Sequence, residues 1–242
     1  HLAGLAHDTS NKSLEEDYFN VNVGLTEKLV NWINKADKPV KFVYFSSIKV
    51  FGDLDCISDE SDKNPTSVYG RSKLAAEKCI ESTLQNYHTY YLLRPVMIYG
   101  EGNKGNLPKL YDLLIKGVPY FFGSWENNRS ILSVQNLDFV VKQLIQKDVA
   151  SDGFIVSDDE TISTYQMLKY LFSAKNLIFI DWKVPSLIIG VSIGITNVLG
   201  IDVLHKLLGN LEVDNSKLKK ALNIKIMPLT TEQGLTIMGK SL

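Results

Sequence analysis

The sequence predicts an α/β fold, a doubly wound parallel sheet followed by a smaller lobe. The first observation is that segments with helical spacing alternate with short apolar runs as far as residue 100. The second is the run Val40–Ser47, which is β-branched, aromatic and almost wholly apolar, as in a parallel strand buried on both faces. The third is a change after Gly100, where glycine-rich loops interrupt the alternation.

The elements expected before residue 100 follow from periodicity and from turn residues. The first helix is indicated by Val21, Leu25, Leu29 and Ile33, which recur at helical spacing. In chain order we expect a helix over Asp17–Ala36, a strand over Val40–Ser47, a loop over Gly52–Thr66, a helix over Ser67–Gln85 and a strand over Thr89–Leu93.

After Gly100 the expected elements are shorter and less regular. They are loops over Glu101–Asn106 and Gly123–Asn128, helices over Leu107–Lys116, Val134–Gln146 and Thr164–Ala174, and a strand over Gly153–Ser157. We therefore expect two domains. Residues 1–100 would form the sheet with the catalytic groups, and residues 101–242 a substrate-binding lobe interleaved with that sheet.

Composition excludes several classes of function. The 242 residues are 45% hydrophobic, which is enough for a large core, and the net charge of −1 predicts no attraction to nucleic acid. The spacing of Cys56 and Cys79 matches no zinc pattern, and we expect no metal and a reducing, cytoplasmic location. Val184–Ile201 has no charged residue, but its glycines, serines and proline favour a buried or interface helix over a membrane-surface helix.

The most informative pattern is a tyrosine and a lysine four residues apart, Tyr69 and Lys73, with Ser46 and Ser47 upstream. Residues four apart share one face of a helix, so the ammonium would favour the ionised phenol and lower its pKa. A hydroxyl from a neighbouring strand would complete a proton-transfer site. Such a site suits removal of a proton from a sugar or alcohol hydroxyl while a hydride leaves the same carbon.

The position of these residues supports a shared site. Ser47 ends one expected strand, Arg94-Pro95-Val96 ends the next, and Tyr69 begins the helix between them. Ligands of open α/β sheets bind beyond the carboxyl ends of the strands. The three segments should therefore converge at one edge of the sheet.

With these residues in place, the chain resembles the extended short-chain dehydrogenase/reductase superfamily, in its nucleotide-sugar epimerase/dehydratase branch. The matching segments are His1-Leu2-Ala3-Gly4, Asn22-Val23, Ser46–Gly52, Tyr69–Lys73, Leu93-Arg94-Pro95, Tyr99-Gly100, Asn106-Leu107, Asn128-Arg129-Ser130 and Leu211–Asp214. The resemblance covers nearly the whole chain and implies a Rossmann-like sheet.

The resemblance also implies a role for individual residues. Tyr69 would be the acid/base at the sugar hydroxyl, Lys73 would hold the nicotinamide ribose and lower the pKa of Tyr69, and Ser47 would bind the reacting oxygen. Further cofactor contacts are implied for Ala3, Gly4, Asn22 and Val96. Substrate contacts are implied for Lys49, Asn106, Tyr120, Phe122 and Arg129, with Asn106 and Arg129 at the diphosphate.

One part of the family pattern is not found in this sequence. Members carry a glycine-rich phosphate loop in the first strand-turn-helix, whereas Gly100–Gly105 follows the wrong strand and lacks that spacing. The resemblance begins at the end of the family's fourth strand, so the sheet would be incomplete at the N-terminus. We expect NAD or NADP in the intact protein, and weak or no dinucleotide binding by residues 1–242 alone.

The function implied is an NAD(P)-dependent C4 epimerase of a UDP-hexose or UDP-N-acetylhexosamine, acting through a 4-keto intermediate. A C4-ketoreductase of UDP-4-keto-6-deoxy-sugars in polysaccharide biosynthesis is the alternative, and a non-catalytic sugar-nucleotide-binding protein is the second. A 4,6-dehydratase is disfavoured because Ile48-Lys49 stand where that branch has an acidic pair. Met97 and Leu211 depart from UDP-galactose epimerases, and Leu211 leaves room for an N-acetyl group. A homodimer through the helices Asp17–Ala36 and Ser67–Gln85 is also implied.

Overall fold

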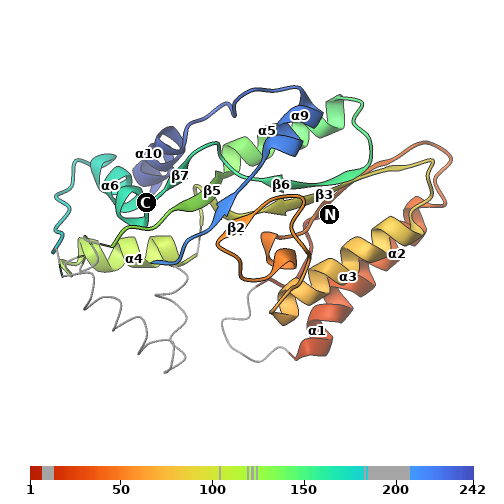
Figure 1. Ribbon diagram of the computed structural model, residues 1–242, viewed down its shortest axis with the longest axis horizontal. Coiled ribbons are helices and arrows are strands. Elements are labelled where there is room, and N and C mark those ends of the chain that lie inside the picture. The colour runs from red at the N-terminus through yellow and green to blue at the C-terminus, as the bar shows by residue number, and fades with distance from the viewer. Residues whose placement is uncertain are drawn as a thin grey trace. The chain divides into compact units, whose positions relative to one another are not determined.

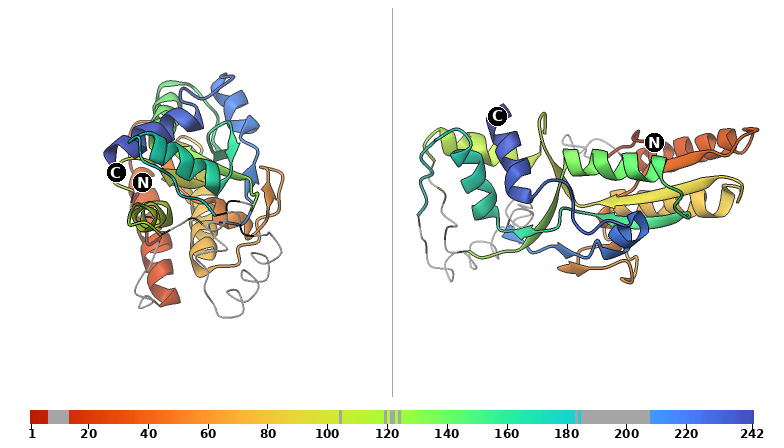
Figure 2. Two further views of the ribbon diagram at one scale, coloured as in Figure 1. Left: turned by 90° about the vertical axis from the view of Figure 1, so that its left-hand side faces the viewer. Right: turned by 90° about the horizontal axis from the view of Figure 1, so that it is seen from above.

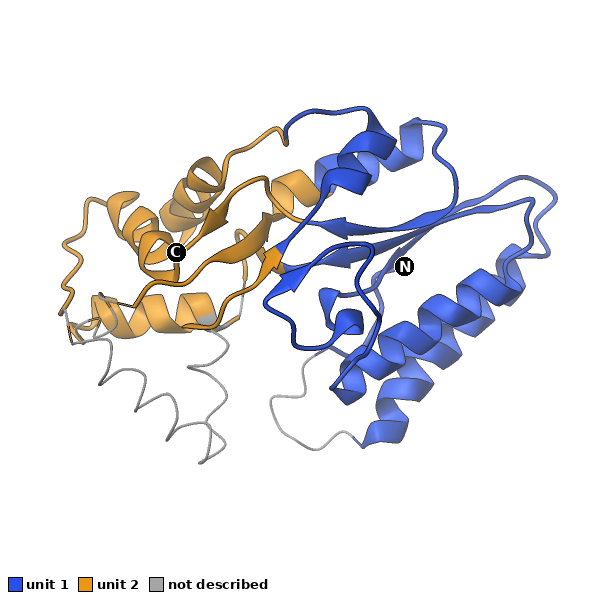
Figure 3. Cartoon of the chain, in the orientation of Figure 1, with its two compact units in different colours: residues 1–96, 138–156, 213–226 blue, residues 97–137, 157–212, 227–242 orange. Residues whose placement is uncertain are grey.

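The computed structural model describes residues 1–6, 14–103, 105–118, 120, 123, 125–182, 184 and 208–242, and Figure 1 shows their secondary structure. The chain divides into two compact units (Figure 3). Residues 1–96, 138–156 and 213–226 form unit 1, and residues 97–137, 157–212 and 227–242 form unit 2. Each unit is built from segments that are far apart in the sequence.

A parallel sheet forms the centre of unit 1. Its strands β1 (Lys41–Phe45), β3 (Thr89–Pro95) and β6 (Asp152–Val156) lie in the order β1-β3-β6. The backbone of His1 extends this sheet beside β1, because its nitrogen donates to Val43 O at 2.7 Å and its oxygen accepts from Phe45 N at 3.3 Å. The predicted parallel α/β sheet is therefore confirmed.

Helices cover both faces of this sheet (Figure 1). On one face lie α1 (Glu15–Phe19), α2 (Leu25–Ile33) and α3 (Val68–Thr83). Apolar side chains of α2 and α3 meet those of β1 and β3 in a core that includes Val30, Tyr44, Ile80 and Leu92. On the other face lie α9 (Ser216–Leu222) and the later part of α5 (Val134–Gln146). Apolar burial on both faces explains why the strands are almost wholly hydrophobic.

The first helix differs from its prediction as one continuous α-helix over Asp17–Ala36. Residues Asn20–Gly24 (η1) form a π-helix between α1 and α2, and the whole helical stretch ends at Ile33. Within it, the Asn22 carbonyl accepts from the Thr26 hydroxyl at 2.7 Å, and the Asn22 side chain is buried. Single π-turns frequently occur at functional sites, and apolar periodicity does not reveal them.

Unit 2 contains a second, mixed sheet. Strand β5 (Arg129–Ser133) pairs in parallel with β4 (Met97–Tyr99) and antiparallel with β7 (Thr161–Ile162). The helices of this unit are α4 (Asn106–Ile115), α6 (Thr164–Ser173) and α10 (Thr231–Ser241). In Figure 2, α6 and α10 lie side by side, and their buried side chains, among them Leu168 and Leu235, are part of its core.

Short elements account for most of the differences from the expected pattern. The loop predicted over Gly52–Thr66 contains β2 (Cys56–Ile57), which pairs with β8 (Glu212–Val213), and the stretch after Ser47 is a 3₁₀-helix, η2 (Ile48–Phe51). Strands of two or three residues are too short to show a periodicity. Within the described residues no helix is long and apolar enough to cross a membrane, and most of Val184–Ile201 lies outside them.

A buried carboxylate fastens the C-terminal segment within unit 2. Asp158 accepts from the Tyr99 hydroxyl at 2.8 Å, from Ser133 N at 3.0 Å and from the Asn136 amide at 2.7 Å. The same Asn136 side chain exchanges two hydrogen bonds with the backbone of Leu229, just before α10. Burial raises the pKa of Asp158, and these hydrogen bonds oppose that rise.

Candidate active site

The start of α3 carries the predicted acid/base pair. The Ser67 hydroxyl caps this helix by accepting from Gly70 N at 3.1 Å. Gly70 is required here by close packing, because a Cβ at this position would lie 2.5 Å from Lys49 O. The close approach brings the segment after β1, which begins with Ser47, against the turn of α3 that holds Tyr69.

Tyr69 is half-buried, and its pKa is raised in this structure. Burial is the main cause, a hydrogen bond with the Ser47 hydroxyl lowers the pKa in part, and Tyr18 raises it. The predicted lowering by Lys73 is not found. The Lys73 ammonium lies 6.0 Å from the centre of the Tyr69 ring and donates to Phe45 O at 2.8 Å instead.

Lys73 is buried with only 4% of its surface exposed. Its ammonium lies 4.8 Å above the ring of Tyr44, a cation–π contact, in addition to its hydrogen bond with Phe45 O. Burial lowers the pKa of Lys73 to about 8, and Glu77 raises it in part. The ammonium is thus the major form at neutral pH, as its predicted role requires.

Asn22 connects the N-terminal segment to α3. Its side chain accepts from Leu5 N at 2.8 Å and donates to Leu5 O at 3.0 Å and to the Ser72 hydroxyl at 2.8 Å. A Cβ on Gly4 would lie 2.9 Å from Asn22 Oδ1 and 3.0 Å from Lys73 Nζ. Gly4, Asn22 and Lys73 therefore lie together, as the cofactor contacts predicted for them require.

A buried ion-pair network beside these residues was not predicted. Glu77, one turn after Lys73 on α3, accepts from Arg94 Nε and Nη2, both at 3.0 Å, and from the Ser46 hydroxyl at 2.5 Å. Arg94 also reaches Asp59 at 3.4 Å. The signal was present in the sequence, since an arginine at the end of an apolar strand needs a buried acidic partner.

The other predicted residues of unit 1 differ in their exposure. Ala3 is exposed, and Val96 is buried just after β3. Lys49 is exposed and forms an ion pair with Asp53 at 2.6 Å. An exposed ion pair is worth little energetically, so the contact between Lys49 and Asp53 can be broken at small cost.

Four predicted substrate contacts belong to unit 2. Arg129 is half-buried at the start of β5, where its Nη1 donates to Gly209 O at 2.6 Å, and burial lowers its pKa. The backbone of Asn106 begins α4. Tyr120 is buried and forms an isolated β-bridge with Asp181, whereas Phe122 lies outside the described residues.

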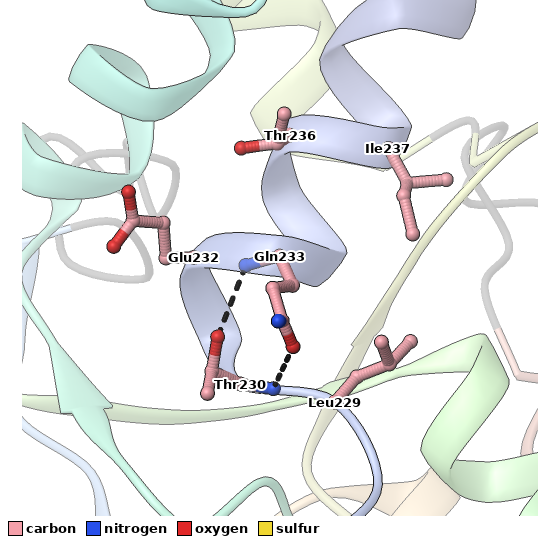
Figure 4. Close-up of a pocket in the computed structure, with 6 residues that line it drawn as sticks. All are labelled: Leu229, Thr230, Glu232, Gln233, Thr236 and Ile237. Atoms are coloured by element: carbon pink, nitrogen blue, oxygen red, sulfur yellow. Dashed lines mark hydrogen bonds between the residues drawn. The ribbon is translucent and has the colours of Figure 1, made fainter.

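A surface hollow formed by described residues lies elsewhere, at the start of α10. It has a volume of about 620 Å³, and its lining residues are Leu229, Thr230, Glu232, Gln233, Thr236 and Ile237. Figure 4 shows the reciprocal hydrogen bonds between Thr230 and Gln233 that begin α10 there. No predicted site residue lines this hollow, and it contains no group suited to acid/base catalysis beyond Glu232. In the part of the chain described, no cluster of three His, Cys, Asp or Glu side chains is placed to bind a metal.

Comparison with known proteins shows the family to which this sequence is similar. The model of the NAD dependent epimerase/dehydratase family matches residues 1–153. A UDP-glucose 4-epimerase of Vibrio cholerae is 33% identical over 97% of this chain and 73% of its own length. An N-acetyl-α-D-glucosaminyl-diphospho-ditrans,octacis-undecaprenol 4-epimerase of Escherichia coli O157:H7 is 26% identical over 79% of this chain and 58% of its own length.

Solved structures support the fold. The UDP-glucuronic acid 4-epimerase of Bacillus cereus, in complex with NAD, superimposes with a TM-score of 0.73 at 17% identity, over 100% of this chain and 72% of that one. At this identity the similarity establishes the fold alone.

Proposed function

We propose that this chain, which belongs to the NAD dependent epimerase/dehydratase family, catalyses the NAD(P)-dependent epimerisation of a UDP-hexose or UDP-N-acetylhexosamine at C4. The observation that carries the proposal is the grouping of Ser47, Tyr69 and Lys73 at the carboxyl end of β1. The 33% identity to a UDP-glucose 4-epimerase over most of the chain supports the choice of substrate class.

The acid/base chemistry is carried out by the side chains grouped at this site, Ser47, Tyr69 and Lys73. The Tyr69 phenolate takes the proton of the 4-hydroxyl as the 4-keto sugar forms, and the resulting phenol returns it when the sugar is reduced on its other face. The Ser47 hydroxyl, which already hydrogen-bonds Tyr69, binds the reacting oxygen. The Lys73 ammonium, which does not lower the pKa of Tyr69 in this structure, would hold the nicotinamide ribose. General acid/base catalysis of this kind contributes about 10²–10⁴-fold to a rate.

The residues of unit 1 fit the nicotinamide end of a dinucleotide. Gly4 leaves open the space that a Cβ would fill beside Asn22 Oδ1 and Lys73 Nζ. Lys73, Asn22, the Ala3-Gly4 backbone and Val96 would hold the bound cofactor there. When bound, the nicotinamide ring would accept the hydride from C4 and later return it to C4.

The raised pKa of Tyr69 is consistent with a phenol that loses its proton only when the cofactor is bound. A phenol whose pKa is raised by burial stays protonated at neutral pH. A cationic nicotinamide next to Tyr69 would favour the phenolate, so deprotonation would be coupled to cofactor binding. The enzyme without cofactor would then hold Tyr69 as the neutral acid.

Contacts to the UDP moiety are proposed for Arg129, Asn106, Lys49, Tyr120 and Phe122. The Arg129 guanidinium has the planar donor geometry that suits a diphosphate, and binding would replace its hydrogen bond to Gly209 O. Asn106 opens α4, whose first backbone N–H groups favour an anion.

We further propose that the intact protein is a cytoplasmic homodimer that associates through the helices that contain α2 and α3. On α2, Trp32 is 71% and Leu25 39% exposed, which leaves apolar surface on a helix that otherwise packs on the sheet. Light scattering should give a dimer mass for the full-length protein and a monomer mass for Trp32→Glu. A monomer mass for the unmodified protein would refute the dimer.

The catalytic proposal is tested by Tyr69→Phe in the full-length protein, with NAD and a panel of UDP-hexoses and UDP-N-acetylhexosamines. We expect the rate of C4 epimer formation, followed by ¹H NMR, to fall by about 10²–10⁴-fold, since the phenol is the proposed proton carrier. Formation of a reduced sugar from a 4-keto substrate in place of an epimer would indicate the ketoreductase.

The matched control is Tyr87→Phe. Tyr87 is 49% exposed, and its hydroxyl only donates to Asp37 O at 2.7 Å. This variant should retain full activity. If Tyr69→Phe turns over every UDP-sugar as fast as the unmodified protein, the catalytic proposal is wrong.

A further inference from the structure

Glu77 is the most completely buried charged side chain beside the proposed catalytic residues, with 0% of its surface exposed. Its Oε1 accepts from the Ser46 hydroxyl at 2.5 Å and from Arg94 Nε at 3.0 Å, and its Oε2 accepts from Arg94 Nη2 at 3.0 Å and from Lys63 Nζ at 3.1 Å. Four donors to one carboxylate explain why its pKa is lowered despite burial, which alone would raise it.

These contacts join the elements on which the catalytic groups are placed. Glu77 belongs to α3, as do Tyr69 and Lys73. Ser46 directly precedes Ser47 after the end of β1, and Arg94 lies near the end of β3, just before Val96. One carboxylate therefore ties both strand ends to the helix that carries the acid/base pair.

We propose that Glu77 is a positioning residue for the reaction proposed above: through Ser46 and Arg94 it fixes where Ser47 lies relative to Tyr69 and Lys73. The inference rests on the proposed function for its kinetic consequence. Its structural consequence, the order of the Ser46-Ser47 backbone, does not depend on that function.

A purely structural ion pair is the competing explanation. Buried ion pairs often add little net stability, because desolvation offsets the attraction between the charges. The hydrogen bond from Ser46 distinguishes the two explanations. It adds nothing to the neutralisation of Arg94, but it links Glu77 directly to Ser46, the residue next to Ser47.

Glu77 also acts on Lys73 through space. Lys73 is surrounded by Tyr69 and Glu77 on its own helix, by Tyr44 on β1, by the backbone nitrogen of His1 and by the neutral side chain of Asn22. Among these groups Glu77 raises the pKa of Lys73, opposing burial. Loss of its charge should therefore shift deprotonation of Lys73 to lower pH.

The test uses Ser46→Ala, Glu77→Gln and the control Glu81→Gln in the full-length protein. Ser46→Ala removes one hydroxyl and leaves the pair between Glu77 and Arg94 in place, so it should fold. Glu81 is exposed one turn further along α3 and serves as a matched loss of charge. For each variant, thermal unfolding, amide hydrogen exchange at residues 45–48, kcat, KM and the pH profile of kcat are measured.

We expect Ser46→Ala to lower kcat about tenfold with KM changed less than twofold. It should raise amide exchange at Ser46 and Ser47, with only the small fall in unfolding temperature that the loss of one hydrogen bond produces. Glu77→Gln, where it folds, should in addition move the alkaline limb of the kcat profile to lower pH. Glu81→Gln should leave all of these unchanged.

If Ser46→Ala has the same kcat and the same amide exchange at Ser46 and Ser47 as the unmodified protein, the positioning role is wrong. Glu77 is then part of a structural ion pair. If the unmodified protein turns over no UDP-sugar, the proposed function fails. The exchange at Ser46 and Ser47 then still decides whether Glu77 orders this segment.

Discussion

Two buried carboxylates, one in each unit, show how different partners produce different roles. Glu77 in unit 1 is neutralised by Arg94, and its pKa is lowered. Asp158 in unit 2 receives hydrogen bonds from the neutral donors Tyr99, Ser133 and Asn136, and its pKa is raised. Both side chains are at most 3% exposed, so burial does not explain the difference.

The two carboxylates therefore differ in role: Glu77 carries a permanent charge, whereas Asp158 holds the backbone through hydrogen bonds. A full positive charge beside Glu77 keeps it ionised, and this permanent charge acts on Lys73. Neutral donors can hold Asp158 in place with a much weaker preference for the ionised form, which suffices to fasten the backbone before α10. We infer that ionisation matters next to the catalytic pair, and that hydrogen-bond geometry alone matters at Asp158.

The largest effect on stability is expected from Arg94→Met. This change leaves the buried Glu77 without its main cation and removes a second cation from Asp59, and breaking a buried pair costs about 3–5 kcal/mol. Chemical denaturation measures the loss. The control Lys142→Met removes the exposed partner of Asp138 on α5 and should cost less than about 0.5 kcal/mol. Equal losses of unfolding free energy in Arg94→Met and Lys142→Met would show that the buried ion pair contributes no more than an exposed one, which would contradict the contrast drawn between Glu77 and Asp158.

A smaller loss is expected from Asp158→Asn. The amide keeps one acceptor for the three donors and introduces no unpaired charge, so the cost should be about 1–3 kcal/mol. Denaturation under the conditions used for Arg94→Met gives the value. A loss larger than that of Arg94→Met would show that the charge of Asp158, rather than its hydrogen bonds, holds this segment.

The smallest and most specific effect is on the pH dependence of the free energy of unfolding. The lowered pKa of Glu77 means that its contribution to the free energy of unfolding is present above pH 4.5 and is lost as the pH falls through its folded pKa. The raised pKa of Asp158 means that its contribution is largest below pH 3.8 and is lost as the pH rises through its folded pKa.

On acidification, therefore, the stability difference between unmodified protein and Glu77→Gln should shrink, whereas that between unmodified protein and Asp158→Asn should grow. Unfolding free energies between pH 3 and pH 7 provide the measurement. Two differences that change in the same direction would contradict the assignment of ionisation states.

The sequence was sufficient for the parallel sheet and for the grouping of Ser47, Tyr69 and Lys73, because long apolar strands and spacing along one helix are local signals. It was insufficient for the π-turn at Asn22 and for the contact between Glu77 and Ser46. Both depend on side chains that meet only after the sheet has formed. The direction of the Tyr69 pKa was mispredicted because spacing reports which residues share a helix face, but not how far burial removes them from water.

The central claim, redox chemistry at C4 with Tyr69 as proton carrier, is tested most directly with a UDP-hexose deuterated at C4. The full-length protein, supplied with NAD, should form the C4 epimer with the deuterium retained at C4 and with a primary isotope effect on kcat. An epimer that has lost its deuterium to solvent, or turnover without an isotope effect in both the unmodified protein and Tyr69→Phe, would contradict the account.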